Sequence, residues 1–253
     1  MPKKVLFIIP SFRIGGTVVS TKNLMILLKQ RSFDCWVLPL KPYGELKALY
    51  DDEQIVETPF AVKSLIGSKW NEKDTLLNRI RAIWFRLIRS VSSTWADHLM
   101  GGAITKSIQP YHFDTIVAGQ ESTTTRLVAY VRHTNKVAWV RSDYTRTFDR
   151  LKKKESSYRS YKAIVCVAEE ITKRFKAIYT EYASKTYCIP NPQAGEFFKV
   201  RAAVRVEESR FKNDKFTIIS VGRLDPIKRF DMIAHIAKEL VERGIGFHWY
   251  LLG

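Results

Sequence analysis

The segment VLFIIPSFRIGGTVVSTKNLMILLKQ, residues 5–30, decides the fold class. It opens with the continuous apolar run Val5–Ile9, which is typical of a strand buried on both faces. The glycine pair Gly15-Gly16 then marks a turn, and Thr17–Gln30 carries apolar residues at roughly helical spacing. A strand that passes through such a turn into a helix begins a β–α–β unit, so the segment predicts an α/β fold.

The same alternation continues along the chain. Further strands are predicted at Cys35–Leu40, Thr115–Ala118, Val137–Val140, Ala163–Ala168 and Thr186–Ile189. Further helices are predicted at Glu45–Tyr50, Glu121–Val131 and Glu169–Tyr182. Strands that alternate with helices need crossover connections, which give a parallel sheet with helices on both faces.

A charged connector, residues 194–214, is expected to separate an N-terminal Rossmann-like domain, residues 1–193, from a second unit, residues 215–253. The second unit has one predicted strand, one helix and one strand: Phe216–Val221, Phe230–Glu242 and Phe247–Leu252. A doubly wound domain needs about 100–150 residues. We therefore expect residues 215–253 to be the start of an incomplete second Rossmann-like domain, and the chain to be part of a longer product.

Composition narrows the class of protein. Hydrophobic residues make up 45% and charged residues 26% of the 253 residues, as in an ordinary soluble globular chain. No apolar run approaches the ~18 residues that span a bilayer, and the N-terminal run is too short for a signal peptide. The net charge of +17 is unusual. It favours an anionic partner, which could be nucleic acid, an anionic membrane or a phosphate-bearing substrate.

The cysteines and histidines do not indicate a metal site. Cys35, Cys166 and Cys188 have no CxxC spacing and lie in strand-like runs. We expect them to be small buried hydrophobic residues in a reducing compartment. The five histidines also lack metal-ligand spacing. No metal and no cofactor are therefore expected.

The turn after the first strand is the first candidate site. Gly15 and Gly16 would let a ligand approach the backbone closely, and the start of the following helix offers free N–H groups to a phosphate. The turn is not a GxGxxG dinucleotide fingerprint. A tight structural turn without a ligand remains the alternative interpretation.

The second candidate site is SVGRLDPIKRFD, residues 220–231. Arg223 and Lys228 flank a turn at the carboxyl end of a predicted strand, where open α/β sheets bind ligands. Cations there could neutralise a departing diphosphate. Upstream, the Pro-Asn-Pro of residues 190–192 predicts a stiff exit from the first domain, with Asn191 able to contact a ligand.

These three motifs, in this order, resemble the retaining glycosyltransferases of family four, which have the GT-B fold. The resemblance implies two Rossmann-like domains, the N-terminal one on the acceptor side and the C-terminal one holding a nucleotide sugar. It implies that Gly15 and Gly16 contact the donor phosphates and that Arg223 and Lys228 bind the diphosphate. It also implies catalysis without a metal ion.

Three positions depart from that family. Arg141 stands where many members have a histidine near the donor sugar, so Arg141 either takes a modified role in orienting the sugar or is a basic residue that ends a strand. Arg229 replaces a frequent glycine. The paired glutamates of the family would lie beyond Gly253, so we expect the 253-residue chain to be inactive alone.

The basic charge has a local focus in Leu76–Trp95, which holds four arginines and no acidic residue. On a helix these arginines lie opposite an apolar arc: Arg79, Arg81, Arg86 and Arg89. Such a helix could lie in a membrane interface with its arginines on anionic lipid. A helix that packs on the sheet with a solvated basic face is an equal alternative. The basic run Arg146–Lys154 could serve the same surface or be a solvated face.

The sequence therefore predicts transfer of a hexose-type unit from a nucleotide sugar to a lipid-linked or polysaccharide acceptor, with retention. Such a cytoplasmic protein would bind the inner face of the cell membrane peripherally and build cell-surface polysaccharide such as lipopolysaccharide or capsule. One alternative is a non-catalytic remnant that binds membrane, acceptor or a partner. The other is a basic nucleic-acid-binding module, although the sequence has no recognition helix or aromatic platform, and nucleic acid is not the expected partner.

Overall fold

The computed structural model describes residues 2–66, 80, 83–84, 87, 90, 92–143, 156–193, 195, 199, 202–203, 215–222 and 224–253. The chain divides into two compact units, Met1–Glu196 and Phe197–Gly253. Each unit is α/β with parallel strands.

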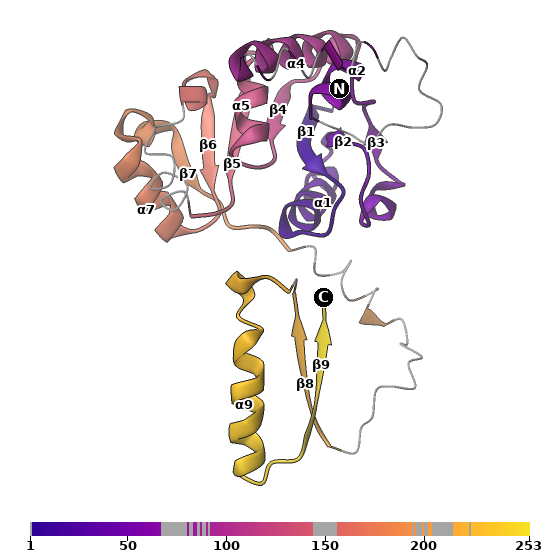
Figure 1. The fold of residues 1–253 in the computed structure, drawn as a ribbon. Coiled ribbons are helices and arrows are strands. Elements are labelled where there is room, and N and C mark those ends of the chain that lie inside the picture. The colour runs from indigo at the N-terminus through magenta and orange to yellow at the C-terminus, as the bar shows by residue number, and fades with distance from the viewer. Residues whose placement is uncertain are drawn as a thin grey trace. The chain divides into compact units, whose positions relative to one another are not determined.

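The first unit is built on a seven-stranded sheet in the order β3-β2-β1-β4-β5-β6-β7 (Figure 1). The strands are β1 (Lys4–Ser11), β2 (Asp34–Lys41), β3 (Gln54–Ile55), β4 (Thr115–Ala118), β5 (Lys136–Val140), β6 (Ala163–Cys166) and β7 (Thr186–Cys188). Every neighbouring pair is parallel, which confirms the predicted fold class. The strand order reverses between β1 and β4, and open α/β sheets bind ligands at such a switch point.

Helices cover both faces of this sheet. One face packs against α1 (Gly16–Lys29) and the short 3-10 helix η1 (Lys47–Tyr50). The other face carries α2 (Phe60–Ile66), α4 (Ser93–Ile108), α5 (Thr123–Ala129) and α7 (Glu169–Ile178). Side chains alternate along β1. Leu6 and Ile8 therefore pack on the face that carries α2, α4, α5 and α7, and Phe7 packs on the face that carries α1.

The second unit is one β–α–β unit. β8 (Phe216–Val221) and β9 (Phe247–Leu252) pair in parallel, starting at Phe216 opposite Phe247. Between them lie the 3-10 turn η5 (Pro226–Lys228) and α9 (Asp231–Glu242). Both strands have their predicted bounds, and the helix begins one residue later than predicted.

The predicted helix Leu76–Trp95 does not continue to Trp95. Ser92 is extended, with φ −152° and ψ 112°, and its hydroxyl accepts the N–H of Trp95 at 3.3 Å. Ser92 is thus the N-cap of α4, a role for which serine is a preferred residue. Residues 80, 83, 84, 87 and 90 are helical. The rest of residues 76–91 lies outside the described residues, including the four arginines expected to face a membrane: Arg79, Arg81, Arg86 and Arg89.

The predicted helix Glu169–Tyr182 is also shorter. α7 ends at Ile178 because Tyr179 leaves the helical region, with φ −114° and ψ 63°. The chain then continues as the 3-10 helix η4 (Thr180–Lys185). In the part of the chain that the structure describes, no helix is long and apolar enough to cross a membrane.

Candidate functional site

The loop between β1 and α1 is held at the switch point by the segment that follows β2. The N–H of Phe12 donates to the carbonyl of Tyr43 at 3.1 Å, and the N–H of Leu46 donates to the carbonyl of Phe12 at 2.8 Å. The N–H of Ile14 donates to the carboxylate of Glu45 at 3.1 Å. The N–H groups of Glu45 itself and of Ile14 hold the pKa of this carboxyl below its usual value. The loop therefore has one defined path.

Gly44 makes this contact possible, although the sequence analysis did not single it out. Its φ of +145° lies in a backbone region that residues other than glycine rarely adopt. A Cβ at Gly44 would lie 2.1 Å from the carbonyl carbon of Phe12. The backbone of residue 44 thus packs directly on the loop, and any larger residue would push the two apart.

Gly15 and Gly16 differ from Gly44, because this chain does not require a glycine at either position. Gly15 is extended, with φ 170°. A Cβ on Gly15 would come no closer than 3.9 Å to the carbonyl oxygen of Arg13, and a Cβ on Gly16 would meet nothing within 4 Å. No side chain caps the start of α1. The backbone here leaves open space in front of a helix N-terminus.

Arg141 follows β5 and joins several segments at the carboxyl edge of the sheet. Its backbone N–H donates to Oε2 of Glu121 at 2.8 Å. Its guanidinium group donates to four acceptors: the Gly119 carbonyl at 2.6 Å, Oδ1 of Asn191 at 2.7 Å, Oγ1 of Thr21 at 3.2 Å, and Oγ of Ser20. Burial lowers the pKa of Arg141 to about 10, and the charge of Glu121 opposes this shift. Two residues predicted separately, Arg141 and Asn191, are thus in direct contact.

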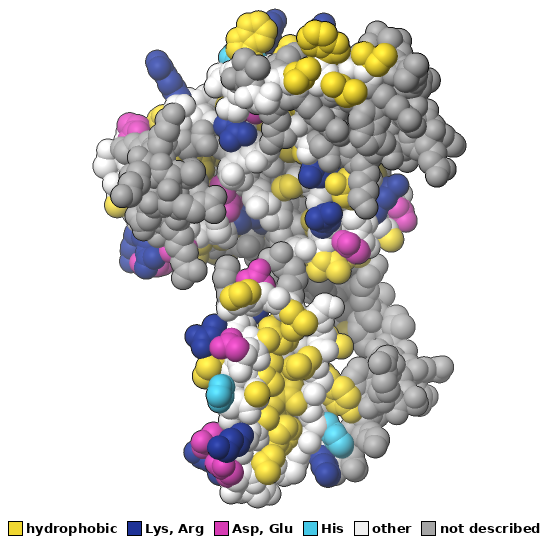
Figure 2. All heavy atoms as spheres, in the orientation of Figure 1, with side chains coloured by type: hydrophobic (Ala, Val, Ile, Leu, Met, Phe, Trp, Pro, Cys, Tyr) yellow, Lys and Arg dark blue, Asp and Glu magenta, His cyan; other side chains and the backbone are white. Residues whose placement is uncertain are grey.

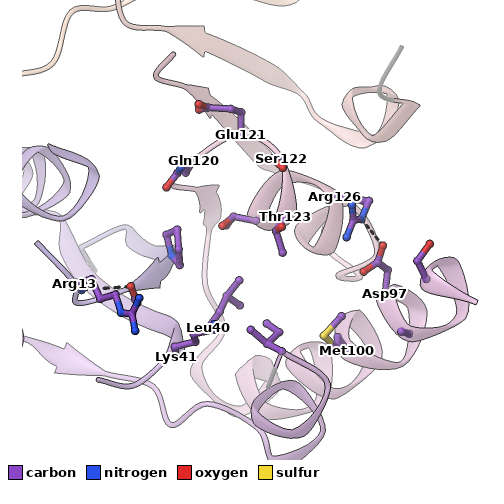
Figure 3. A pocket seen from close by; sticks show the side chains of 16 residues that line it. Arg13, Leu40, Lys41, Asp97, Met100, Gln120, Glu121, Ser122, Thr123 and Arg126 are labelled. Carbon is purple, nitrogen blue, oxygen red and sulfur yellow. Dashed lines mark hydrogen bonds and ion pairs between the residues drawn. The ribbon is translucent and has the colours of Figure 1, made fainter. Parts of the chain in front are cut away.

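A pocket of about 440 Å³ opens at the carboxyl ends of β1 and β4, on the face of the sheet that carries α2, α4 and α5 (Figure 3). Charged side chains line it from several elements: Arg13, Lys41, Asp97, Glu121 and Arg126. An ion pair between α4 and α5 forms part of the wall, with Oδ2 of Asp97 and Nε of Arg126 2.5 Å apart. The sequence analysis did not single out this ion pair, because its partners are 29 residues apart and only the tertiary fold brings them together.

The second unit holds Lys228, which lies exposed at the end of η5. Its side chain passes close to the end of β8, since a Cβ on Gly222 would lie 3.7 Å from Cγ of Lys228. Arg223 lies outside the described residues. Arg229 has φ +53°, a left-handed conformation that explains the glycine frequent at this position in the resembling family, and its guanidinium pairs with Asp231 at 3.2 Å.

The structure thus brings Arg141 into contact with Asn191 and links it through the Ser20 hydroxyl to the carbonyl of Gly16. Gly15 lies in the same unit, and Lys228 lies in the second unit. The expectation of three buried cysteines is confirmed for Cys35 and Cys166 but is wrong for Cys188. Cys188 is exposed because it ends β7, which is an edge strand of the sheet. Among the described residues, no group of three or more His, Cys, Asp and Glu side chains could hold a metal ion.

No protein-family model matches the chain, and no curated protein matches it. Solved structures do resemble it. A glycosyltransferase from Rickettsia africae has 11% identity and a TM-score of 0.53, over 99% of this chain and 69% of its own. HepE from Anabaena, solved with UDP-glucose, has 11% identity and a TM-score of 0.52, over 99% of this chain and 69% of its own. An alpha-glucosyltransferase solved with UDP-glucose and DNA containing an abasic site has 11% identity and a TM-score of 0.57, over 98% of this chain and 57% of its own. At such identity the likeness shows the fold alone, which is of the GT-B type.

Proposed function

We propose that this chain carries sites of a retaining glycosyltransferase, which moves a hexose-type unit from a nucleotide sugar to a lipid-linked or polysaccharide acceptor. Such transfer would serve the synthesis of a cell-surface polysaccharide such as lipopolysaccharide or capsule. The observation that carries the proposal is the open glycine pair, Gly15-Gly16, at the switch point of a GT-B type sheet.

The donor phosphates are the ligand that this position suits best. Neither glycine is demanded by the packing or by the backbone angles given above, so the lack of side chains leaves room for something outside the chain. A helix N-terminus without a side-chain cap presents free N–H groups, which favour an anion. Two of the similar structures were solved with UDP-glucose, which supports a nucleotide sugar as that anion.

In this proposal Arg223 and Lys228 neutralise the charge on the leaving diphosphate, without a metal ion or other cofactor. Such cations act by stabilising charge that develops in the transition state. Arg141 takes a positioning role in it. Its guanidinium group donates four hydrogen bonds to other residues of the chain, two of them to Ser20 and Thr21 of α1 and one to Asn191. It would thus hold α1 and Asn191 in place beside the donor phosphates.

We also propose that the protein binds the inner face of the cell membrane peripherally, through the surface around residues 80–99. Several large apolar side chains are exposed there: Ile80, Ile83, Trp84, Leu87, Trp95 and Leu99. Hydrophobic side chains gather over α4 in Figure 2. The arginines at positions 79, 81, 86 and 89 would add affinity of about 1 kcal/mol each for anionic lipid. Sedimentation with anionic vesicles, compared with a Trp84→Ser/Trp95→Ser variant, tests this surface.

Donor binding is tested by titrating the purified chain with UDP-, GDP- and ADP-hexoses in a calorimeter. Gly16→Ala should weaken the hexose donor that binds by about tenfold, the effect of losing about 1.4 kcal/mol. Gly102→Ala is the matched control, because a Cβ on Gly102 also meets nothing within 4 Å but lies in α4. Equal donor affinity of the Gly16→Ala variant and the parent would contradict the proposed phosphate contact.

The reaction itself needs separate measurements. If no nucleotide sugar binds the chain, the phosphate contact proposed for Gly15 and Gly16 fails and the non-catalytic alternative gains support. Because the 253-residue chain is expected to be inactive alone, the stereochemistry is measured on a preparation that transfers the sugar. Proton NMR of the new glycosidic bond then decides between retention and inversion. An inverted product would overturn the retaining mechanism while leaving the donor site intact.

A further inference from the structure

The pocket at the carboxyl ends of β1 and β4 is lined by charged and hydroxyl side chains that are not part of the proposed donor contact. Its two acidic side chains are already engaged within the chain. Asp97 is 4% exposed and forms the ion pair with Arg126. Glu121 is buried and accepts the N–H of Arg141 at 2.8 Å and the hydroxyl of Ser142. Neither carboxylate is therefore available to hold a cation in the pocket.

Two other cationic side chains of the pocket lining, Lys41 and Arg13, are not paired with a carboxylate of the described residues as Arg126 is. Lys41 ends β2 and forms no ion pair with any residue that the structure describes. Arg13 is exposed, with its Cζ 5.7 Å from the ring centroid of Tyr43. Glu45, whose pKa Arg13 helps to lower, is outside the pocket lining and already accepts the N–H of Ile14. The pocket therefore attracts anions.

The remaining lining combines hydroxyl groups with an apolar wall. Five hydroxyl side chains come from β1, α4 and the start of α5: Ser11, Ser93, Ser122, Thr123 and Thr124. The apolar wall is formed mainly by Leu40, Ile66 and Met100. Hydroxyl donors together with Lys and Arg suit the several oxygens of a phosphate group, and the apolar wall suits carbon attached to it.

We propose that this pocket binds a phosphate group carried by the acceptor, an inference that rests on the proposed function. The end of β1 and the loop after it support the assignment, because they supply Ser11 and Arg13 to the pocket and the loop reaches Gly15 two residues after Arg13. One loop would thus hold the acceptor phosphate on one side and the donor phosphates on the other. Such placement brings two reactants together, which is a large part of the catalysis of group transfer.

The test is calorimetry on the full 253-residue chain with two phosphate probes, geranyl phosphate and glucose 1-phosphate. Geraniol and glucose are the neutral counterparts. At least one phosphate should bind, while its neutral counterpart should not. Lys41→Gln should weaken the binding by about tenfold. Lys106→Gln is the matched control, since it removes the same charge from an exposed position of α4 outside the pocket lining.

A blocking variant adds a second measurement. Ser93 is exposed at the start of α4 and lines the pocket, so Ser93→Trp should fill the entrance and abolish binding without disturbing the core. Preference for geranyl phosphate would assign a lipid phosphate, preference for glucose 1-phosphate a sugar phosphate, and both outcomes support the proposal. Unchanged binding in both Lys41→Gln and Ser93→Trp overturns it.

Two further outcomes separate this inference from the proposed function. If a nucleotide sugar displaces the phosphate probe competitively, the pocket belongs to the donor and the inference is wrong. If a nucleotide sugar binds but neither phosphate probe does, the inference fails and the proposed function stands. If a phosphate probe binds and no nucleotide sugar does, the phosphate site stands and the donor contact proposed for Gly15 and Gly16 fails.

Discussion

Replacing Gly44 by alanine tests whether the segment after β2 determines the path of the glycine loop. The new Cβ would lie 2.1 Å from the carbonyl carbon of Phe12, which is backbone and cannot rotate away. The two segments must separate, and the two backbone hydrogen bonds that join Phe12 to Tyr43 and Leu46 are then lost. The φ of +145° adds strain to any residue with a side chain.

The magnitude follows from these losses. Each hydrogen bond contributes about 0.5–1.5 kcal/mol net, and an unfavourable backbone region costs about 1–3 kcal/mol. We therefore expect Gly44→Ala to lower the free energy of unfolding by about 2–6 kcal/mol in total. For a unit of this size that lowers the melting temperature by about 4–24 °C.

Urea unfolding followed by circular dichroism measures the loss, with Gly16→Ala as the control from the same loop. A Cβ on Gly16 meets nothing, so this variant should be as stable as the parent or more stable. Nucleotide-sugar titration at 15 °C then asks whether folded Gly44→Ala protein still binds a donor. A Gly44→Ala variant as stable as Gly16→Ala would refute the packing argument.

Three further predictions concern other parts of the first unit. Gly101→Ala should destabilise the protein by about 1–3 kcal/mol through overpacking, since its Cβ would lie 2.6 Å from Cβ of Tyr130. The neighbouring Gly102→Ala should instead stabilise α4 by about 0.5–1 kcal/mol. Thermal melts of the two variants measure this difference, and equal shifts in melting temperature would contradict it. Iodoacetamide at pH 8 should label Cys188 first, because Cys188 is exposed, whereas burial raises the pKa of both Cys35 and Cys166 to about 12 and keeps these thiols protonated. Peptide mass spectrometry measures the order of labelling, and early labelling of Cys35 would refute the prediction. Arg141→Lys should lower the free energy of unfolding by about 2–4 kcal/mol, because one ammonium group cannot reach all four acceptors and hydrogen bonds to charged groups contribute about 1.5–3 kcal/mol each; urea titration measures it.

The fold of the first unit could be predicted because its central strands are buried on both faces. Continuous apolar runs such as Val5–Ile9 and Ala163–Ala168 mark such strands, and the structure has a strand at each. The two-residue strand β3 gives no such signal, since Gln54 and Ile55 are both exposed. The start of α4 at Ser92 was missed because the apolar pattern of residues 76–95 runs across this N-cap, and periodicity alone does not reveal a cap.

The candidate site was predictable only where a local pattern carries it. Gly15 and Gly16 stand out because two glycines follow a strand and precede a helix. Gly44 has an equally strict requirement, but its contact with Phe12 joins residues 32 positions apart and leaves no local pattern. The pocket and its Asp97–Arg126 ion pair depend on how α4 and α5 pack, which follows from the tertiary structure alone.

The hydrogen bonds of Arg141 also have a consequence for the order in which the protein folds. Its acceptors lie up to 121 residues away along the chain, at Ser20, and Asn191 is 50 residues further toward the C-terminus. The complete set of contacts can form only after residue 191 has left the ribosome and the sheet has been assembled. Contacts between such distant residues form late because closing long loops is entropically unfavourable. Arg141→Lys should therefore speed unfolding and leave the folding rate nearly unchanged, so that the carboxyl edge of the sheet, where ligands would bind, is the last region to become ordered.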